Sequence, residues 1–231
     1  MIIAFSGSAG VGKSTAFETI RANSKGRAVC LTKFAAPLYS IQEQIYRLIS
    51  PVYQRPDTFV KDRKLLQWLG TEWGRDTISK TLWVDLWKAR TQFVQAKDAE
   101  LIVVCDDCRF ENEAQTVHSL GGVIIKLTSN RSFDIGGISG HASEAGLPSQ
   151  YVDYEIENNG TVEEFQAAVQ ATIAKIEADL AIRAAQQPQA TEAPVLEEED
   201  FMPECAVQTK PAEQAPAEEP ALNDDDFLPT T

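Results

Sequence analysis

The sequence is poor in several features that would each indicate a different class of protein. It has no apolar run near the roughly 18 residues of a membrane span, and its first ten residues lack the basic segment of a secretory signal. It contains only two histidines, His118 and His141, and four cysteines. These absences argue against a membrane protein and against a secreted disulfide scaffold, and they predict a cytoplasmic protein.

Two of the cysteines, Cys105 and Cys108, form a single C-x-x-C pair. A zinc site needs a second such pair or nearby histidines. A redox motif needs the pair at the start of a helix in a thioredoxin-like unit. Because Cys105 instead ends an apolar run and acidic residues follow it, we predict ordinary reduced thiols.

Positive charge is scarce in the last part of the chain. The 231 residues carry 21 Lys and Arg against 34 Asp and Glu, a net charge of −13, and −11 of this falls in residues 186–231. That segment holds seven of the eleven prolines and no glycine, a composition that buries too little apolar surface to offset chain entropy. We predict a disordered acidic tail over 186–231, a folded domain over 1–185, and no direct binding to nucleic acid.

The tail contains a near-repeat, EEEDFMP at 197–203 and NDDDFLP at 223–229. Each copy is an acidic run followed by Phe, an apolar residue and Pro. The repeat is either a chance feature of an acidic linker or a duplicated motif that inserts Phe into a pocket on a partner. The second interpretation predicts a partner from a replication or nucleotide-synthesis assembly.

The most specific motif is a phosphate-binding loop near the start of the chain. GSAGVGKS at 7–14 matches G-x-x-x-x-G-K-[ST] in full, follows an apolar run and precedes a helical stretch. We expect the loop amides and the helix N-terminus to bind ATP phosphates, Lys13 to reach the β- and γ-phosphates, and Ser14 to hold Mg²⁺. The predicted nucleotide-binding residues are Gly7, Ser8, Ala9, Gly10, Val11, Gly12, Lys13, Ser14 and Thr15.

The order of the predicted elements indicates the fold class. Apolar runs alternate with stretches of helical periodicity, which favours a parallel sheet with right-handed crossovers. The predicted fold is a three-layer α/β/α P-loop NTPase domain with a mostly parallel sheet. We predict strands over 2–6, 28–34, 101–105, 123–128 and 154–158, and helices over 13–23, 35–50, 61–73, 83–97, 111–119 and 161–185.

A second group of polar residues follows the strongest predicted strand, in LIVVCDDCRFENE at 101–113. Carboxylates at the carboxyl end of a parallel strand are well placed to organise Mg²⁺, and both Asp106 and Asp107 qualify. Arg109 lies two residues further on and is expected to meet phosphate oxygens at the same sheet edge.

Four segments together carry a resemblance to a known family: FSGSAGVGKST, LLQWLGTEWGRD, DDCRFENEA and HASE. In this order they resemble the deoxynucleoside monophosphate kinases of tailed bacteriophages, over roughly residues 1–160. The resemblance implies transfer of the ATP γ-phosphate to a deoxynucleoside monophosphate. It implies that Asp107 supports Mg²⁺ or the acceptor and that Arg109 contacts phosphate or braces the site.

The resemblance also implies an acceptor pocket and a lid. Trp83, like Trp68 and Trp73, either stacks on a base or belongs to the core. Segment 130–144 resembles a short lid, with Arg131 over the transferred phosphate and His141 and Glu144 in supporting roles. The implied acceptor-binding residues are Lys33, Phe34, Arg63, Gln67, Arg75 and Trp83.

Other functions remain open at this point. A P-loop kinase with another small acceptor, such as dephospho-coenzyme A or a sugar acid, shares the same loop. A nucleotide-binding interaction module that works through its tail is a second alternative, although the arginines at 63, 75, 109 and 131 argue against it. Related kinases make a homodimer an option, and the sequence does not determine which bases are accepted.

Overall fold

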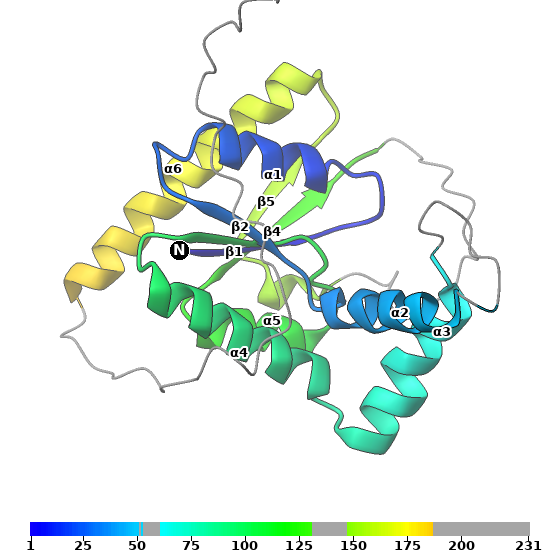
Figure 1. Cartoon of the computed structure of the whole chain (residues 1–231). Helices are drawn as coiled ribbons and strands as arrows, with labels where there is room; N and C mark the ends of the chain where they lie inside the picture. Colours follow the sequence, from blue (N-terminus) through cyan, green and yellow to red (C-terminus); the bar gives the residue numbers. More distant parts are fainter. Residues whose placement is uncertain (51, 53–60, 131–146, 187–231) are drawn as a thin grey trace, which may run out of the picture.

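The computed structural model describes residues 1–50, 52, 61–130 and 147–186. Its centre is a five-stranded sheet in the order β2-β3-β1-β4-β5, and each neighbouring pair is parallel (Figure 1). The predicted fold is confirmed, with the described sheet parallel throughout. The strands are β1 (Ile2–Ser6), β2 (Val29–Thr32), β3 (Ile102–Cys105), β4 (Val123–Thr128) and β5 (Tyr154–Glu157).

Parallel strands that are covered on both faces read as continuous apolar runs, and β1 shows this pattern. All five of its residues are buried, and Ile3 pairs with both Val104 and Val123. The central strand therefore ends directly at the glycine loop, and β2 and β3 end at the same edge of the sheet. This edge is where ligands of open α/β sheets bind.

Helices cover both faces of the sheet and complete the three layers (Figure 1). One core packs α1 (Lys13–Ala22) and α6 (Val162–Gln186) against the sheet through residues such as Phe17 and Phe165. The other core packs α4 (Leu82–Lys97) and α5 (Glu111–Ser119) through Trp87 and Val117.

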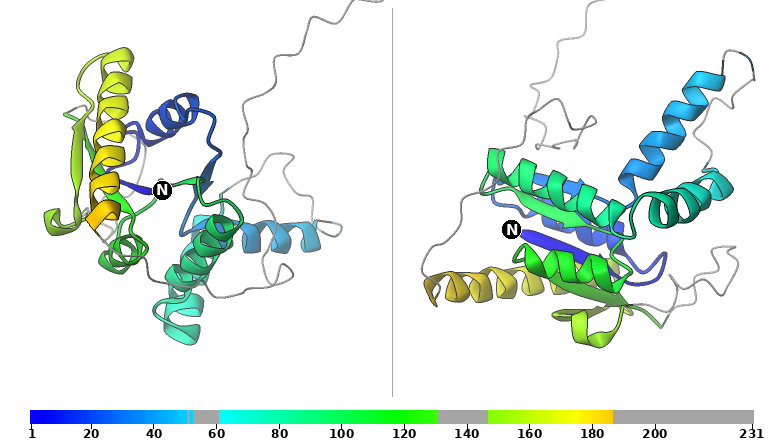
Figure 2. Two further views of the ribbon diagram at one scale, coloured as in Figure 1. Left: turned by 90° about the vertical axis from the view of Figure 1, so that its left-hand side faces the viewer. Right: turned by 90° about the horizontal axis from the view of Figure 1, so that it is seen from below.

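A helical extension projects beyond the sheet (Figure 2). It consists of α2 (Ala36–Ile49), α3 (Arg63–Trp68) and η1 (Leu69–Ile78), a π-helical segment that continues α3. The sequence predicts one helix over 61–73, so its boundaries are wrong: the helix starts two residues later and continues to Ile78. The segment beyond Trp68 has π-helical geometry, and the indole of Trp83 packs against it where an ideal Cβ on Gly74 would lie.

The remaining features are short. A 3₁₀ turn, η3 (Ser149–Tyr151), precedes β5. Within the described ranges, no helix is long and apolar enough to cross a membrane. The predicted tail, apart from Gln186, and the predicted lid, apart from Asn130, lie outside the described residues.

Candidate functional site

The P-loop connects β1 to α1 and depends on glycine at three positions. Gly7, Gly10 and Gly12 have φ values of 140°, 80° and 110°, a region that other residues rarely adopt. Gly7 is further required by space, since a Cβ there would lie 2.4 Å from the Leu127 carbonyl oxygen. The loop is thus pressed against the end of β4 while its other side stays open.

The functional side chains of the loop follow at the start of α1. Lys13 Nζ donates to the carbonyl oxygens of Gly7, at 2.8 Å, and Ser8, at 2.6 Å. Burial lowers the pKa of Lys13, and the nearby Arg109 lowers it further. Ser14 and Thr15 line the adjoining cavity. A cation and a hydroxyl therefore meet the free N–H groups of a helix N-terminus.

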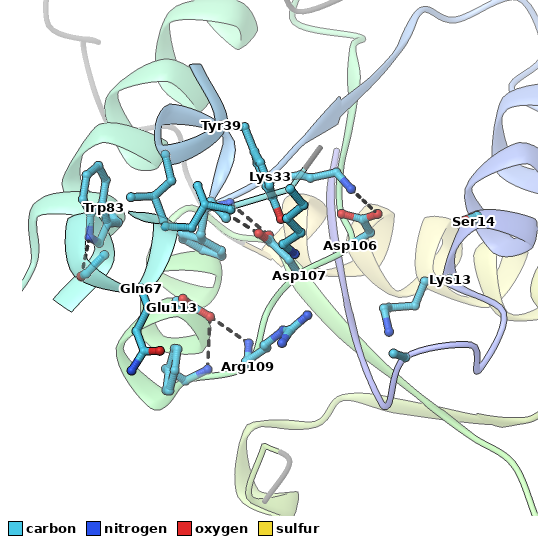
Figure 3. A pocket seen from close by; sticks show the side chains of 18 of the residues that line it. Lys13, Ser14, Lys33, Tyr39, Gln67, Trp83, Asp106, Asp107, Arg109 and Glu113 are labelled. Atoms are coloured by element: carbon cyan, nitrogen blue, oxygen red, sulfur yellow. Dashed lines mark hydrogen bonds and ion pairs between the residues drawn. The ribbon is translucent and has the colours of Figure 1, made fainter. Parts of the chain in front are cut away.

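One cavity of about 690 Å³ runs from the P-loop to the helical extension (Figure 3). Of the loop residues, Ala9, Gly10 and Gly12 line it, whereas Val11 is fully buried behind. The cavity also brings together most of the other residues singled out in the sequence. These are Lys33, Phe34, Gln67, Arg75, Trp83, Asp106, Asp107 and Arg109.

One predicted acceptor-binding residue, Arg63, and one predicted catalytic residue, Arg131, are not placed in this cavity. Arg63 begins α3, is exposed and is not among the lining residues. Arg131 lies outside the described residues, as do His141 and Glu144. Their predicted contacts with phosphate or the lid stay predictions.

The two neighbouring acids have different surroundings. Both carboxylate oxygens of Asp107 accept backbone N–H groups, from Phe34 at 2.9 Å and Ala35 at 3.0 Å. Burial raises the pKa of Asp107. Asp106 pairs through Oδ2 with Lys33 at 2.9 Å, and its buried Oδ1 has no hydrogen-bond partner among the described residues. In Figure 3, Asp106 lies between Lys33 and the P-loop side chains.

Glu113 is a site residue that the sequence reasoning missed. Its Oε2 accepts the backbone N–H groups of Arg109, at 2.7 Å, and Phe110, at 3.1 Å, and it lines the cavity. Burial raises the pKa of Glu113 to about 7. The signal was a glutamate at the third position of a helix, which is typical of a capping box. Tyr39 and Lys61 also line the cavity and were not predicted.

Aromatic residues form the wall at the far end of the cavity. Trp83 is buried, and its indole N–H donates to the Gly70 carbonyl at 2.9 Å. The Arg75 guanidinium lies 5.1 Å from the centre of the Phe110 ring. Trp68 is 51% exposed and does not line the cavity, which leaves Trp83 as the tryptophan beside the site.

The C-x-x-C pair lies under this site rather than in it. Cys105 and Cys108 are free and buried, and burial raises the pKa of both thiols. Neither thiol takes part in a disulfide, and their reduced state in the cell stays a prediction. Cys105 Sγ–H donates to Asp107 Oδ1 at 3.2 Å, so this thiol helps to hold the carboxylate.

Comparison with known sequences identifies the family. A profile described as "Deoxynucleotide monophosphate kinase" matches residues 39–169, more than half of the chain. The chain belongs to the deoxynucleotide monophosphate kinase family. The match starts within α2 and includes the rest of the helical extension and the Asp106–Glu113 segment, which supply about half of the residues that line the cavity. The P-loop precedes the match and stands on its own residues and geometry.

Individual relatives differ in how much of their length is matched. A "putative deoxynucleotide monophosphate kinase" of Acanthamoeba polyphaga mimivirus is 29% identical over 187 residues, 73% of this chain and 94% of the viral protein. The deoxynucleoside-5′-monophosphate kinase of Escherichia phage T5 is 29% identical over 106 residues, 43% of this chain. The chain thus spans only 40% of the phage T5 protein.

Solved structures of similar shape include two kinases. Dephospho-CoA kinase from Campylobacter jejuni has a TM-score of 0.43 at 16% identity and covers 76% of this chain and 96% of its own. Thymidylate kinase from Ehrlichia chaffeensis has a TM-score of 0.38 at 14% identity, with 75% and 98% covered. Because these TM-scores are below 0.5, we assign the fold from the strand order of this chain itself.

Proposed function

We propose that this protein transfers the γ-phosphoryl group of ATP to deoxynucleoside monophosphates and so makes diphosphates for phage DNA synthesis. The observation that carries the proposal is the single cavity, which is continuous from the P-loop to a pocket walled by Phe34, Trp83 and Phe110. An ATP-binding loop and a base-sized aromatic pocket within one cavity suit two nucleotides bound with their phosphates facing each other. Family membership supports the same reaction.

The chain's own residues suit phosphoryl transfer by positioning and charge. Lys13 already lies over the loop, and we expect it to exchange the Gly7 and Ser8 carbonyls for phosphate oxygens. Arg109 and Arg75 line the cavity further out and offset charge on the acceptor phosphate. The acceptor is itself an anionic nucleophile, so direct in-line transfer needs neither a covalent enzyme intermediate nor a general base.

Mg²⁺ fits the donor set beside the P-loop. Proteins usually hold Mg²⁺ through one or two carboxylates together with substrate phosphates, and the described residues contain no cluster of three or more potential ligands. Ser14 and Asp106 would hold the ion, since the buried Oδ1 of Asp106 lacks a hydrogen-bond partner. The ion would neutralise phosphate charge. Asp107, which the resemblance implies for Mg²⁺ or the acceptor, directs both carboxylate oxygens to the Phe34 and Ala35 N–H groups, so we assign the ion to Asp106 and the support of the Phe34–Ala35 backbone to Asp107.

The end of the cavity proposed for the acceptor has apolar walls and polar side chains beside them. Phe34 and Trp83 offer surface to a base, and Gln67 and Lys33 lie at the same cavity with hydrogen-bond donors. Arg63 lies outside the lining, so its role in acceptor binding would require a change of conformation. Arg131 remains the proposed cation over the transferred phosphate on the evidence of sequence alone.

The tail carries a separate part of the proposal. Residues 186–231 hold two copies of an acidic run followed by Phe, an apolar residue and Pro. We expect the two copies to bind a replication or nucleotide-synthesis protein through basic pockets that accept Phe. The cytoplasmic location and the homodimer stay predictions.

A substrate panel tests the proposed reaction. The protein is incubated with ATP, Mg²⁺ and each deoxy- or ribonucleoside monophosphate, with dephospho-coenzyme A and a sugar acid as alternative acceptors, and phosphorylated products are quantified. We expect diphosphates from deoxy acceptors, loss of turnover in Lys13→Ala, and a higher Mg²⁺ requirement in Asp106→Asn. Wild-type turnover in Lys13→Ala, or product only from another acceptor class, would overturn the assignment.

A further inference from the structure

Asn158 follows β5 and contacts the P-loop from behind. Its side-chain Nδ2 donates to the Val11 carbonyl oxygen at 2.9 Å. Its backbone N–H donates to the Thr128 carbonyl at 2.7 Å, and its own carbonyl accepts the Ser129 hydroxyl at 2.9 Å. Asn158 is therefore held at the ends of β4 and β5, and through Val11 it ties the P-loop to them.

The packing around this contact leaves little freedom. A Cβ on Gly12 would lie 2.8 Å from Asn158 Nδ2 and 3.0 Å from Cε1 of Phe165. Asn158 is not among the described residues that line the cavity, whereas Gly12 is. The side-chain amide of Asn158 thus contacts the loop backbone at a place that does not face the cavity.

The contact has a consequence for the direction of the next backbone N–H. In a trans peptide the C=O and N–H bonds point in opposite directions, and the described chain has no cis peptide bonds. Holding the Val11 carbonyl toward Asn158 therefore turns the Gly12 N–H away from Asn158. A P-loop binds phosphate through such N–H groups, so the orientation of this peptide decides whether Gly12 contributes a donor.

Three other carbonyls of the loop have donors in the loop or in α1. Those of Gly7 and Ser8 accept Lys13, and that of Gly12 accepts the helical N–H of Ala16 at 2.9 Å. The Val11 carbonyl is held by a residue 147 positions away. Among the described residues, Asn158 donates to this oxygen, and no residue of the P-loop motif does.

We infer that Asn158 is a positioning residue for ATP: it orients the Val11–Gly12 peptide so that the Gly12 N–H binds phosphate. The inference rests on the proposed function only for the identity of the nucleotide. The β5–α6 connection thereby affects the affinity for the nucleotide. It does so through the loop backbone, without direct contact with phosphate.

The test compares two adjacent asparagines. Asn158→Asp replaces the donor with an oxygen that repels the Val11 carbonyl, and Asn158→Ala removes the donor without adding charge. Asn159→Asp is the matched control, since Asn159 is exposed and its side-chain oxygen accepts the Asn130 N–H at 2.7 Å, which Asp retains. Its Nδ2 donates to the exposed Glu157 carboxylate at 3.4 Å, and this surface contact is the one that Asp loses. We would measure the Kd for ATP with Mg²⁺ by calorimetry, the KM for both substrates, and the thermal unfolding midpoint.

We expect both Asn158 variants to raise the Kd for ATP about tenfold to hundredfold, the range for one hydrogen bond to a charged group. The KM for the acceptor should stay within about twofold, and Asn159→Asp should bind ATP like the unmodified protein. Unchanged ATP affinity in the Asn158 variants would overturn the inference. So would equal losses for ATP and acceptor, because these indicate a merely structural role.

The design also separates this inference from the proposed function. An unmodified protein that binds ATP but phosphorylates no deoxynucleoside monophosphate would overturn the proposed reaction, while the Asn158 comparison would still be decided by ATP binding. An unmodified protein that binds no ATP would overturn both.

Discussion

At the scale of single residues, Glu113 shows how the site depends on a buried charge. One carboxylate oxygen of Glu113 accepts the backbone N–H groups of Arg109 and Phe110. Burial raises the pKa of Glu113 from 4.5 to about 7. The folded state therefore binds a proton at Glu113 more tightly than the unfolded state does. The stabilising contribution is complete below about pH 4.5 and is lost as the pH rises through 7.

The variant Glu113→Gln tests this linkage, because Gln keeps an acceptor oxygen for the two N–H groups but does not ionise. We expect the variant to gain stability relative to the wild type as the pH rises from 5 to 7.5, by about 1–3 kcal/mol. Denaturant unfolding of both proteins at the two pH values measures the change. A stability difference that is the same at both pH values would show that Glu113 does not titrate in this range.

At the scale of elements, the π-helical segment η1 depends on the contact between Gly74 and Trp83. A Cβ on Gly74 would lie 2.4 Å from Trp83 Cζ2 and 2.8 Å from the Leu69 carbonyl oxygen, so the indole in the cavity wall must move. We expect Gly74→Ala to lower the free energy of unfolding by about 1–3 kcal/mol. The KM for the acceptor should rise more than that for ATP.

Gly70 offers a control in the same segment. The nearest atom to a Cβ there is Leu38 Cδ1 at 3.5 Å, an ordinary contact, so Gly70→Ala should leave stability unchanged or slightly higher. Chemical unfolding and steady-state kinetics of the two variants decide the matter. Equal effects at Gly70 and Gly74 would mean that helix propensity, and not Trp83 packing, controls this wall.

At the scale of the whole molecule, the charge distribution separates a nearly neutral body from an acidic tail. All the described residues that line the cavity lie between Ala9 and Glu113, so removal of 187–231 should leave kcat and both KM values unchanged within about twofold. Capture of the proposed partner should be lost. Kinetics and pull-down of the truncated and full chains measure both, with Phe201→Ala together with Phe227→Ala as the full-length control. A truncated protein that retains every partner would overturn the role of the tail.

The sequence alone determined the features that depend on neighbours along the chain. The P-loop is contiguous because its function uses successive backbone N–H groups, and each buried strand is an apolar run in its own right. The strand and helix order followed from these local signals. The proposed reaction came from the resemblance carried by several such segments.

Tertiary structure decided what depends on residues that are distant in the chain. Asp106 and Asp107 are neighbours with the same chemistry, and their distant partners distinguish them: Lys33 pairs with Asp106, whereas the Phe34 and Ala35 N–H groups bind Asp107. Two other contacts also join residues that are separated in the chain. Asn158 holds the Val11 carbonyl from 147 positions away, and Trp83 packs against Gly74 from 9 positions away. These contacts leave no local pattern, because packing selects residues by position in space and not by spacing in sequence.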